Sequence, residues 1–176
     1  MRTMSGEGPS RDPVLLTGGR PVRLLKEEDA EEVLALCLEN PLYYRYYPPG
    51  PTRESVLRDM RALPPGKGYS DKYFLGYEDR EGLMAVLDLI LGYPDESAAF
   101  VGFFMTDASI QNRGIGSSII GELCRTLKEA GYREARLGWV KGNPQSARFW
   151  RRNGFRETGA SYETDGYTVV IARRDL

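Results

Sequence analysis

The stretch Gln111-Asn112-Arg113-Gly114-Ile115-Gly116-Ser117 separates two segments of different character. Residues 100–105 before it form an apolar run typical of a buried strand, and residues 115–130 after it carry apolar side chains at helical spacing. A strand, a glycine-bearing turn and a helix in that order place several unpartnered backbone N–H groups at a helix start, where the helix dipole adds positive potential. Gly114 and Gly116 would let a phosphate approach the backbone, so the stretch predicts a pyrophosphate site.

Two well-known phosphate motifs are absent from the chain. There is no Gly-x-x-x-x-Gly-Lys-Ser/Thr, and no Gly-x-Gly-x-x-Gly follows an early strand, so neither a nucleotide P-loop nor a dinucleotide fold is indicated. From these residues alone, a glycine-rich turn that binds nothing remains the alternative to an anion site.

A second segment, residues 143–155, follows about thirty residues later and reads Asn-Pro-Gln-Ser-Ala-Arg-Phe-Trp-Arg-Arg-Asn-Gly-Phe. The first stretch resembles Gln/Arg-x-x-Gly-x-Gly/Ala, the coenzyme A pyrophosphate loop of the GNAT superfamily of N-acetyltransferases. The second resembles the family's Asn-x-x-Ala-x-x-x-Tyr-x-x-x-Gly-Phe signature at the right spacing. It departs in two places, since Ala147 comes one position late and Trp150 stands where tyrosine is usual. The resemblance covers residues 20–174.

The resemblance implies an α/β fold with a mixed, mostly antiparallel sheet flanked by helices. It also implies an acetyl-CoA-dependent N-acetyltransferase that moves the acetyl group directly to a primary amine. In the family, the strand before the glycine loop splays from the next strand, and the pantetheine arm of the cofactor pairs with it there. The cofactor-binding residues carried over are Phe104, Met105, Thr106, Gln111, Asn112, Arg113, Gly114, Ile115, Gly116, Ser117, Asn143 and Trp150. For Asn143, capping of the following helix is a second expected role.

A base matters for this reaction because an amine must lose its proton before it attacks a thioester. Some family members use a glutamate five residues before the signature asparagine, but here that position is Gly138. Asp88 is therefore the candidate catalytic carboxylate, with Glu96 and Glu163 as alternatives, although a structural or solvated side chain is the more frequent role for each. With no histidine in the chain, we expect weak general-base power and a preference for amines of low pKa.

Trp150 is the second candidate for the reaction centre. An indole N–H donates a hydrogen bond but is not a usable acid, so the tyrosine role of protonating the departing thiolate is lost. Trp150 is expected to hold the sulfur or the arm, or to be a core aromatic residue.

The aromatic segment Tyr43, Tyr44, Arg45, Tyr46 and Tyr47 lies between the first two expected helices. In the family this region lines the acceptor side, and tyrosine rings with a nearby arginine suit an acceptor that carries an amine and a carboxylate. A loop packed by its own rings is the alternative interpretation. The sequence does not distinguish a small-molecule amine from a protein N-terminus as acceptor.

Bulk properties limit the remaining possibilities. The chain has 176 residues and a net charge of −1, which suits one domain over residues 14–176 and gives no basic field for nucleic acid. Residues 1–13 are polar and are expected to be a flexible tail, and no apolar run has membrane-spanning length. We expect a cytoplasmic protein without a metal, with Cys37 and Cys124 as buried thiols. A homodimer and a non-catalytic acyl-CoA-binding module remain open.

The element order expected from periodicity and turn residues is β-α-α-β-β-β-α-β-α-β-β. The expected elements are a hairpin over 14–24, a helix after 27–29 that ends at Asn40, a helix over 54–62, strands over 73–77, 83–93 and 97–106, a helix over 115–130, a strand over 134–140, a helix begun by Asn143 and a hairpin over 155–173.

Overall fold

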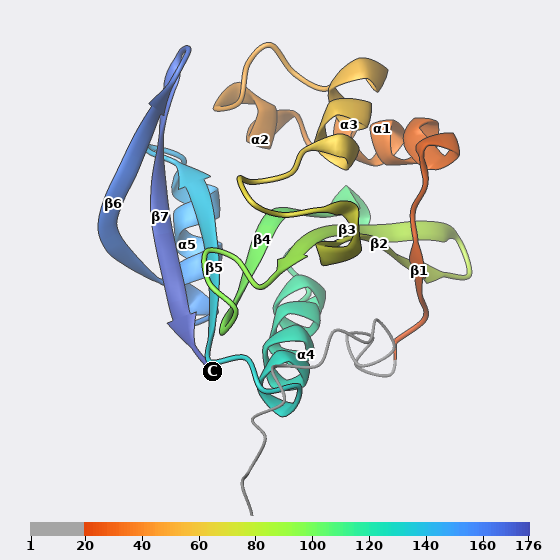
Figure 1. The fold of residues 1–176 in the computed structure, drawn as a ribbon. Coiled ribbons are helices and arrows are strands. Elements are labelled where there is room, and N and C mark those ends of the chain that lie inside the picture. The colour runs from red at the N-terminus through yellow and green to blue at the C-terminus, as the bar shows by residue number, and fades with distance from the viewer. Residues whose placement is uncertain (1–19) are drawn as a thin grey trace, which may run out of the picture.

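The computed structural model describes residues 20–176 and contains one seven-stranded sheet flanked by helices (Figure 1). The strand order is β1-β2-β3-β4-β5-β7-β6, and all neighbours are antiparallel except β4 and β5. The strands are β1 (Val22–Leu24), β2 (Lys72–Asp79), β3 (Gly82–Leu91), β4 (Ala98–Thr106), β5 (Glu134–Val140), β6 (Arg156–Thr164) and β7 (Tyr167–Asp175). The helices are α1 (Ala30–Leu38), α2 (Pro41–Arg45), α3 (Arg53–Arg61), α4 (Ile115–Glu129) and α5 (Pro144–Arg152).

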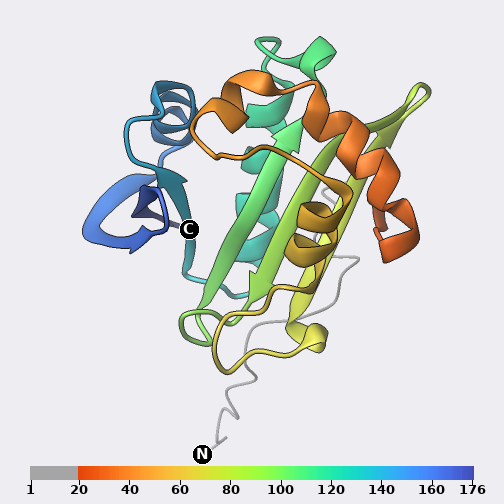
Figure 2. The same ribbon diagram turned by 90° about the horizontal axis from the view of Figure 1, so that it is seen from above.

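Helices cover both faces of the sheet (Figure 2). On one face, α4 buries Ile119, Ile120 and Leu123 against alternate residues of β2 and β3 such as Leu87 and Leu89. On the other face, α1 and α3 pack over the remaining alternate residues, which include Phe74, Val86 and Met105. This alternation follows from the two-residue period of a strand, and it places Asp88 on the α1 and α3 face. The fold agrees with the mixed, mostly antiparallel sheet predicted from the sequence.

The parallel pair β4–β5 separates part of the way along. Ladder pairing runs only from Ala98 with Glu134 to Val101 with Leu137. Beyond that point β4 continues to Thr106 and β5 to Val140 without pairing to each other. The separation leaves one edge of β4 open in the middle of the sheet.

A bulge lies at the point where the two strands separate. Asp88 pairs with Phe103 and Leu89 pairs with Val101, so Gly102 is the extra residue of β4. A Cβ added at Gly102 would lie 2.5 Å from Oδ2 of Asp88. The carboxylate of Asp88 therefore occupies the space that a side chain at position 102 would need, so any residue other than glycine would displace it.

One local expectation differs from the structure, and one is only partly covered by it. Val22–Leu24 forms a strand that pairs with β2, from Val22 opposite Tyr77 to Leu24 opposite Leu75. The earlier part of that expected hairpin and the expected tail lie outside the described residues. The expected tyrosine loop begins as helix α2, because Pro41 is a favourable first helical residue.

The other predicted elements are confirmed to within a few residues, and Cys37 and Cys124 are buried free thiols. Within residues 20–176, no helix is long and apolar enough to cross a membrane.

Candidate functional site

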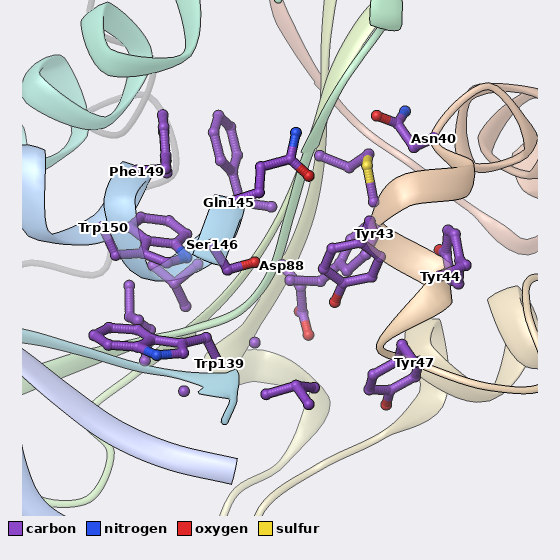
Figure 3. Close-up of a pocket in the computed structure, with 18 of the residues that line it drawn as sticks. Asn40, Tyr43, Tyr44, Tyr47, Asp88, Trp139, Gln145, Ser146, Phe149 and Trp150 are labelled. Atoms are coloured by element: carbon purple, nitrogen blue, oxygen red, sulfur yellow. The ribbon is translucent and has the colours of Figure 1, made fainter. Parts of the chain in front are cut away.

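A cavity of about 850 Å³ opens between α2 and α3 on one side and α5 on the other. Its wall includes the part of β4 that lies beyond the separation, from Val101 to Thr106. Figure 3 shows Phe149 and Trp150 of α5 on one side, tyrosines of α2 on the other and Asp88 between them. The cavity thus joins the expected cofactor region to the expected acceptor region.

The glycine loop forms one end of this cavity. Gly114 is the N-cap of α4 with a φ of 78°, a left-handed conformation that favours glycine, and Asn112 has a φ of 59°. The first helical bond in this turn is donated by the Ser118 N–H to Gly114, so the N–H groups before it remain available to an anion. Of the predicted loop residues, Gln111, Asn112, Gly114, Gly116 and Ser117 line the cavity.

Arg113 and Ile115 were also predicted to contact the cofactor, but their side chains do not line the cavity. Phe104, Met105 and Thr106 do line it. A Cβ at Gly116 would lie 3.3 Å from Phe149 Cε2 and 3.6 Å from Thr106 Cγ2. The backbone of this turn is therefore held close to both neighbouring elements, and a side chain at 116 would crowd the route between them.

The side-chain amides of Asn40 and Gln111 connect the glycine loop to neighbouring elements. Gln111 Nε2 donates to Oδ1 of Asn40 and, at 3.2 Å, to the carbonyl oxygen of Thr106. Asn40 Nδ2 donates to the same Thr106 oxygen at 3.1 Å and to the Leu36 oxygen at 2.9 Å. Asn40 thus connects the end of α1 to the end of β4 and to the loop. Sequence reasoning treated Asn40 only as a helix end, and the Asn-Pro step carries no signal of this longer-range contact.

Trp150 is both a core residue and a wall of the cavity. It is 8% exposed, and its ring lies 5.9 Å from Phe104, 4.9 Å from Phe149 and 5.3 Å from Phe155, between ring centres. The interpretation of Trp150 as a core aromatic residue is therefore confirmed, and its contact with the cofactor stays a prediction. Such aromatic packing fixes the orientation of the ring.

Asn143 caps α5. Its Oδ1 accepts from the backbone N–H of Gln145 at 3.1 Å and of Ser146 at 3.2 Å, and its Nδ2 donates to Ser146 Oγ at 3.0 Å. The side chain is fully buried and does not line the large cavity, whereas Gln145 and Ser146 do. The capping role is confirmed, and the adjacent helix start lines the cavity, while contact of Asn143 with the cofactor stays a prediction.

Asp88 is the buried carboxylate of the cavity. Its two oxygens lie 2.8 Å and 2.9 Å from Nζ of Lys72, which also donates to the Asp59 carbonyl oxygen at 3.0 Å. Oδ1 accepts no well-directed hydrogen bond despite its burial. Burial raises the pKa of Asp88 to about 6, because loss of water outweighs the opposing effect of Lys72. A carboxyl group with this pKa can accept a proton near neutral pH.

The alternative carboxylates lie elsewhere. Glu96 is exposed, and Glu163 accepts hydrogen bonds from Thr168 Oγ1 on the exposed hairpin. Neither residue lines the cavity. Position 138 has no room for the glutamate used in some relatives, since a Cβ there would lie 2.6 Å from Val169 Cγ1.

The tyrosines of the α2 region differ in whether they line the cavity. Tyr43, Tyr44 and Tyr47 line it, while Arg45 and Tyr46 do not. Helix α2 ends at Arg45, so Tyr47 reaches the cavity from the turn that follows the helix. The predicted acceptor contact of Arg45 and Tyr46 is therefore not supported by their position, and Arg45 is exposed.

One ring of this group reaches the opposite wall. The ring of Tyr47 lies 5.0 Å from that of Tyr167 on β7, between centres. Tyr43 and Tyr44 pack edge to face at 4.9 Å, and Tyr43 also contacts Phe103 of β4. Burial raises the pKa of Tyr43, Tyr44 and Tyr47, so these hydroxyls stay protonated at neutral pH.

Comparisons with known proteins agree with this geometry. Residues 35–155, more than half of the chain, match the model of the Acetyltransferase (GNAT) family. An acetyltransferase structure from Thermus thermophilus is 22% identical with a TM-score of 0.71, and the match covers 89% of this chain and 96% of that one. A comparison with curated proteins gave no match.

Two further structures share the fold at lower identity. The ribosomal-protein-S18-alanine N-acetyltransferase of Escherichia coli is 13% identical, with a TM-score of 0.63 and coverage of 89% of this chain and 94% of that one. PaiA N-acetyltransferase of Thermoplasma acidophilum, solved with coenzyme A, is 20% identical, with a TM-score of 0.60 and coverage of 89% and 98%. With the family model, the fold and the cavity in agreement, the chain belongs to the GNAT family of acetyltransferases, whose acetyl donor is acetyl-CoA.

Proposed function

We propose that this protein transfers an acetyl group from acetyl-CoA directly to a primary amine, with Asp88 as the base. The observation that carries the proposal is the place of Asp88. Its carboxylate lies over Gly102, at the point where β4 and β5 separate and at the floor of the cavity.

The cofactor fits the residues that are present. The loop from Asn112 to Ser117 offers free N–H groups at a helix start, and the open edge of β4 beyond Val101 can pair with an extended amide-bearing arm. An arm that starts at the loop and pairs along β4 runs from Thr106 back to Gly102, where the two strands separate. These four residues span about 13 Å, at roughly 3.3 Å per residue of strand. Gly102 and Asp88 lie at that end.

When bound, acetyl-CoA supplies an activated acetyl group as a thioester. The amine nitrogen forms a bond to the acetyl carbon, the carbon–sulfur bond breaks, and the amine proton goes to Asp88. The electron pair of the broken bond leaves with the sulfur. A thiol with an ordinary pKa of about 8.5 is a tolerable leaving group even when no acid protonates it. Trp150 then holds the arm without giving a proton.

Neither cysteine of the described chain is placed to form a covalent acetyl intermediate. Cys37 and Cys124 are buried, and burial raises the pKa of both thiols, which disfavours the nucleophilic thiolate. The acceptor amine therefore has to enter the same cavity as the acetyl donor. A small-molecule amine and a protein N-terminus both present such a group, and the second class is named for the Escherichia coli relative.

The proposal is tested by the release of free thiol from acetyl-CoA in the presence of a panel of amines. Asp88→Asn should lower kcat by about 10²–10⁴-fold, the range for loss of a general base, while calorimetry shows unchanged binding of coenzyme A. Glu163→Gln is the matched control, because it removes a carboxylate that lies outside the cavity.

Asp88→Asn also leaves Lys72 buried without its partner, so a double variant with Lys72→Met is needed to separate misfolding from loss of the base. Full activity in either folded variant would refute Asp88 as the base. Tight binding of coenzyme A with no thiol release for any amine would instead identify a non-catalytic acyl-CoA-binding module.

A further inference from the structure

A second carboxylate, Asp59 of α3, faces the acceptor side of the cavity. Among residues 20–176, it makes no ion pair and no side-chain hydrogen bond. Two nearby cations, Arg58 on the same helix and Lys72 on β2, lower the pKa of Asp59. Lys72 donates to the carbonyl oxygen of Asp59 and not to its carboxylate, and Arg58 is exposed to solvent. Loss of water outweighs them and raises the pKa of Asp59.

The position of Asp59 is unfavourable for the helix that carries it. Asp59 lies in the last turn of α3, which ends at Arg61, where the helix dipole opposes a negative charge. A partly desolvated carboxylate without a partner also costs free energy. Neither helix stability nor an internal ion pair accounts for this side chain.

The surroundings of Asp59 suit a cation. Asp59 lines the same cavity as the rings of Tyr43, Tyr44 and Tyr47, and its charge contributes to the raised pKa of the three hydroxyls. Aromatic faces together with a carboxylate attract an ammonium group. Asp88 supplies the second negative group of the cavity, and its Oδ1 lacks a directed hydrogen bond.

We infer that the acceptor carries two amino groups, one held by Asp59 and the tyrosine rings while the other is acetylated beside Asp88. This inference rests on the proposed function and specifies its substrate class as a diamine or a longer polycationic amine. It also replaces the carboxylate-bearing acceptor expected from Arg45, because that side chain lies outside the cavity.

Three ligands of matched length test the inference. These are 1,6-diaminohexane, n-heptylamine and 6-aminohexanoate, which share a reacting amine and end in a cationic, neutral or anionic group. Steady-state kinetics should give the lowest KM for the diamine, by about tenfold or more over heptylamine, which corresponds to about 1.4 kcal/mol. The order of these KM values is measured on the wild-type protein, so a folding defect in a variant cannot affect it.

Asp59→Asn should remove this preference, raising the KM for the diamine about tenfold and leaving kcat/KM for heptylamine within about twofold. Glu54→Gln is the matched control, since it makes the same charge change at an exposed position of the same helix outside the cavity. Equal KM values for diamine and monoamine, a lower KM for 6-aminohexanoate, or equal effects of the two variants would each overturn the inference.

Calorimetry of 1,6-diaminohexane with the protein–coenzyme A complex gives a readout that does not require turnover. If no amine is acetylated but the diamine still binds in an Asp59-dependent way, the proposed function fails while the cation site stands. If amines are acetylated with no dependence on Asp59, the proposed function stands and the cation site is wrong.

Discussion

Replacement of Gly102 by alanine would test the geometry at the separation of β4 and β5. The added Cβ would lie 2.5 Å from Oδ2 and 3.2 Å from Cγ of Asp88. To reach an ordinary contact of 3.4 Å, the carboxylate must move by about 0.9 Å. The Asp88 oxygens lie only 2.8–2.9 Å from Lys72 Nζ, so a movement of this size weakens the buried ion pair.

We expect Gly102→Ala to destabilise the protein by about 1–3 kcal/mol, the range for a forced shift of packed side chains, because the added methyl group displaces the buried Asp88 carboxylate from Lys72. Displacement of a catalytic group by about 1 Å costs about 10²-fold in rate, so kcat should fall by roughly that factor. Binding of coenzyme A to the glycine loop should change little, because the loop lies at the other end of the cavity.

The assay combines thermal unfolding, calorimetry with coenzyme A and thiol-release kinetics. Gly121→Ala is the control, since a Cβ at that position of α4 has nothing within 4 Å and alanine favours a helix. Unchanged kcat in a folded Gly102→Ala protein would refute the argument that the carboxylate must stay over Gly102.

Three further outcomes are expected. Gly114→Val should weaken coenzyme A binding by more than about tenfold, measured by calorimetry, because a branched residue resists the φ of 78° at this helix start; equal affinity would mean that the anion site is elsewhere. Trp150→Phe should lower kcat only modestly and keep the basic limb of the pH–rate profile, and loss of that limb would indicate that Trp150 positions a hidden acid. With Asp88 as base, kcat/KM should fall as pH drops through about 6. Because this pKa lies above the ordinary 3.8, the folded state binds the proton more tightly than the unfolded state, so the contribution of Asp88 to stability should rise as pH drops from about 6 towards 3.8. A pH-independent kcat/KM between 5 and 7 would exclude this base.

The order of helices and strands could be predicted from the sequence because local patterns determine it. Asn143 and Pro144 mark the start of α5, and Gly114 marks the start of α4. Helix α2 is hard to predict because tyrosines and prolines are typical of loops, and Pro41 favours a helix only as its first residue.

The site was only partly predictable, because its remaining features depend on contacts between distant segments. Asn40 accepts a hydrogen bond from Gln111, which lies 71 positions away in the sequence, and no local motif predicts such a contact. No sequence pattern indicates that Asp59 lines the cavity either, since a carboxylate near the end of an amphipathic helix is usually solvated. Which side chains of this segment line the cavity, Tyr43, Tyr44 and Tyr47 but not Arg45, depends on how the segment packs against β4 and β7, and no local pattern shows this.

The early end of the β4–β5 ladder has a consequence for the protein in the cell. Backbone groups of β4 beyond Val101 that face β5 lack a strand partner, so the unliganded protein retains an unfinished sheet edge in its interior. A ligand that pairs with this edge binds only the folded chain and adds about 2.7 kcal/mol of stability at a free concentration one hundred times its Kd. The lifetime of the protein would then follow the supply of its own acetyl donor, and starvation for that donor would expose the chain to unfolding and proteolysis.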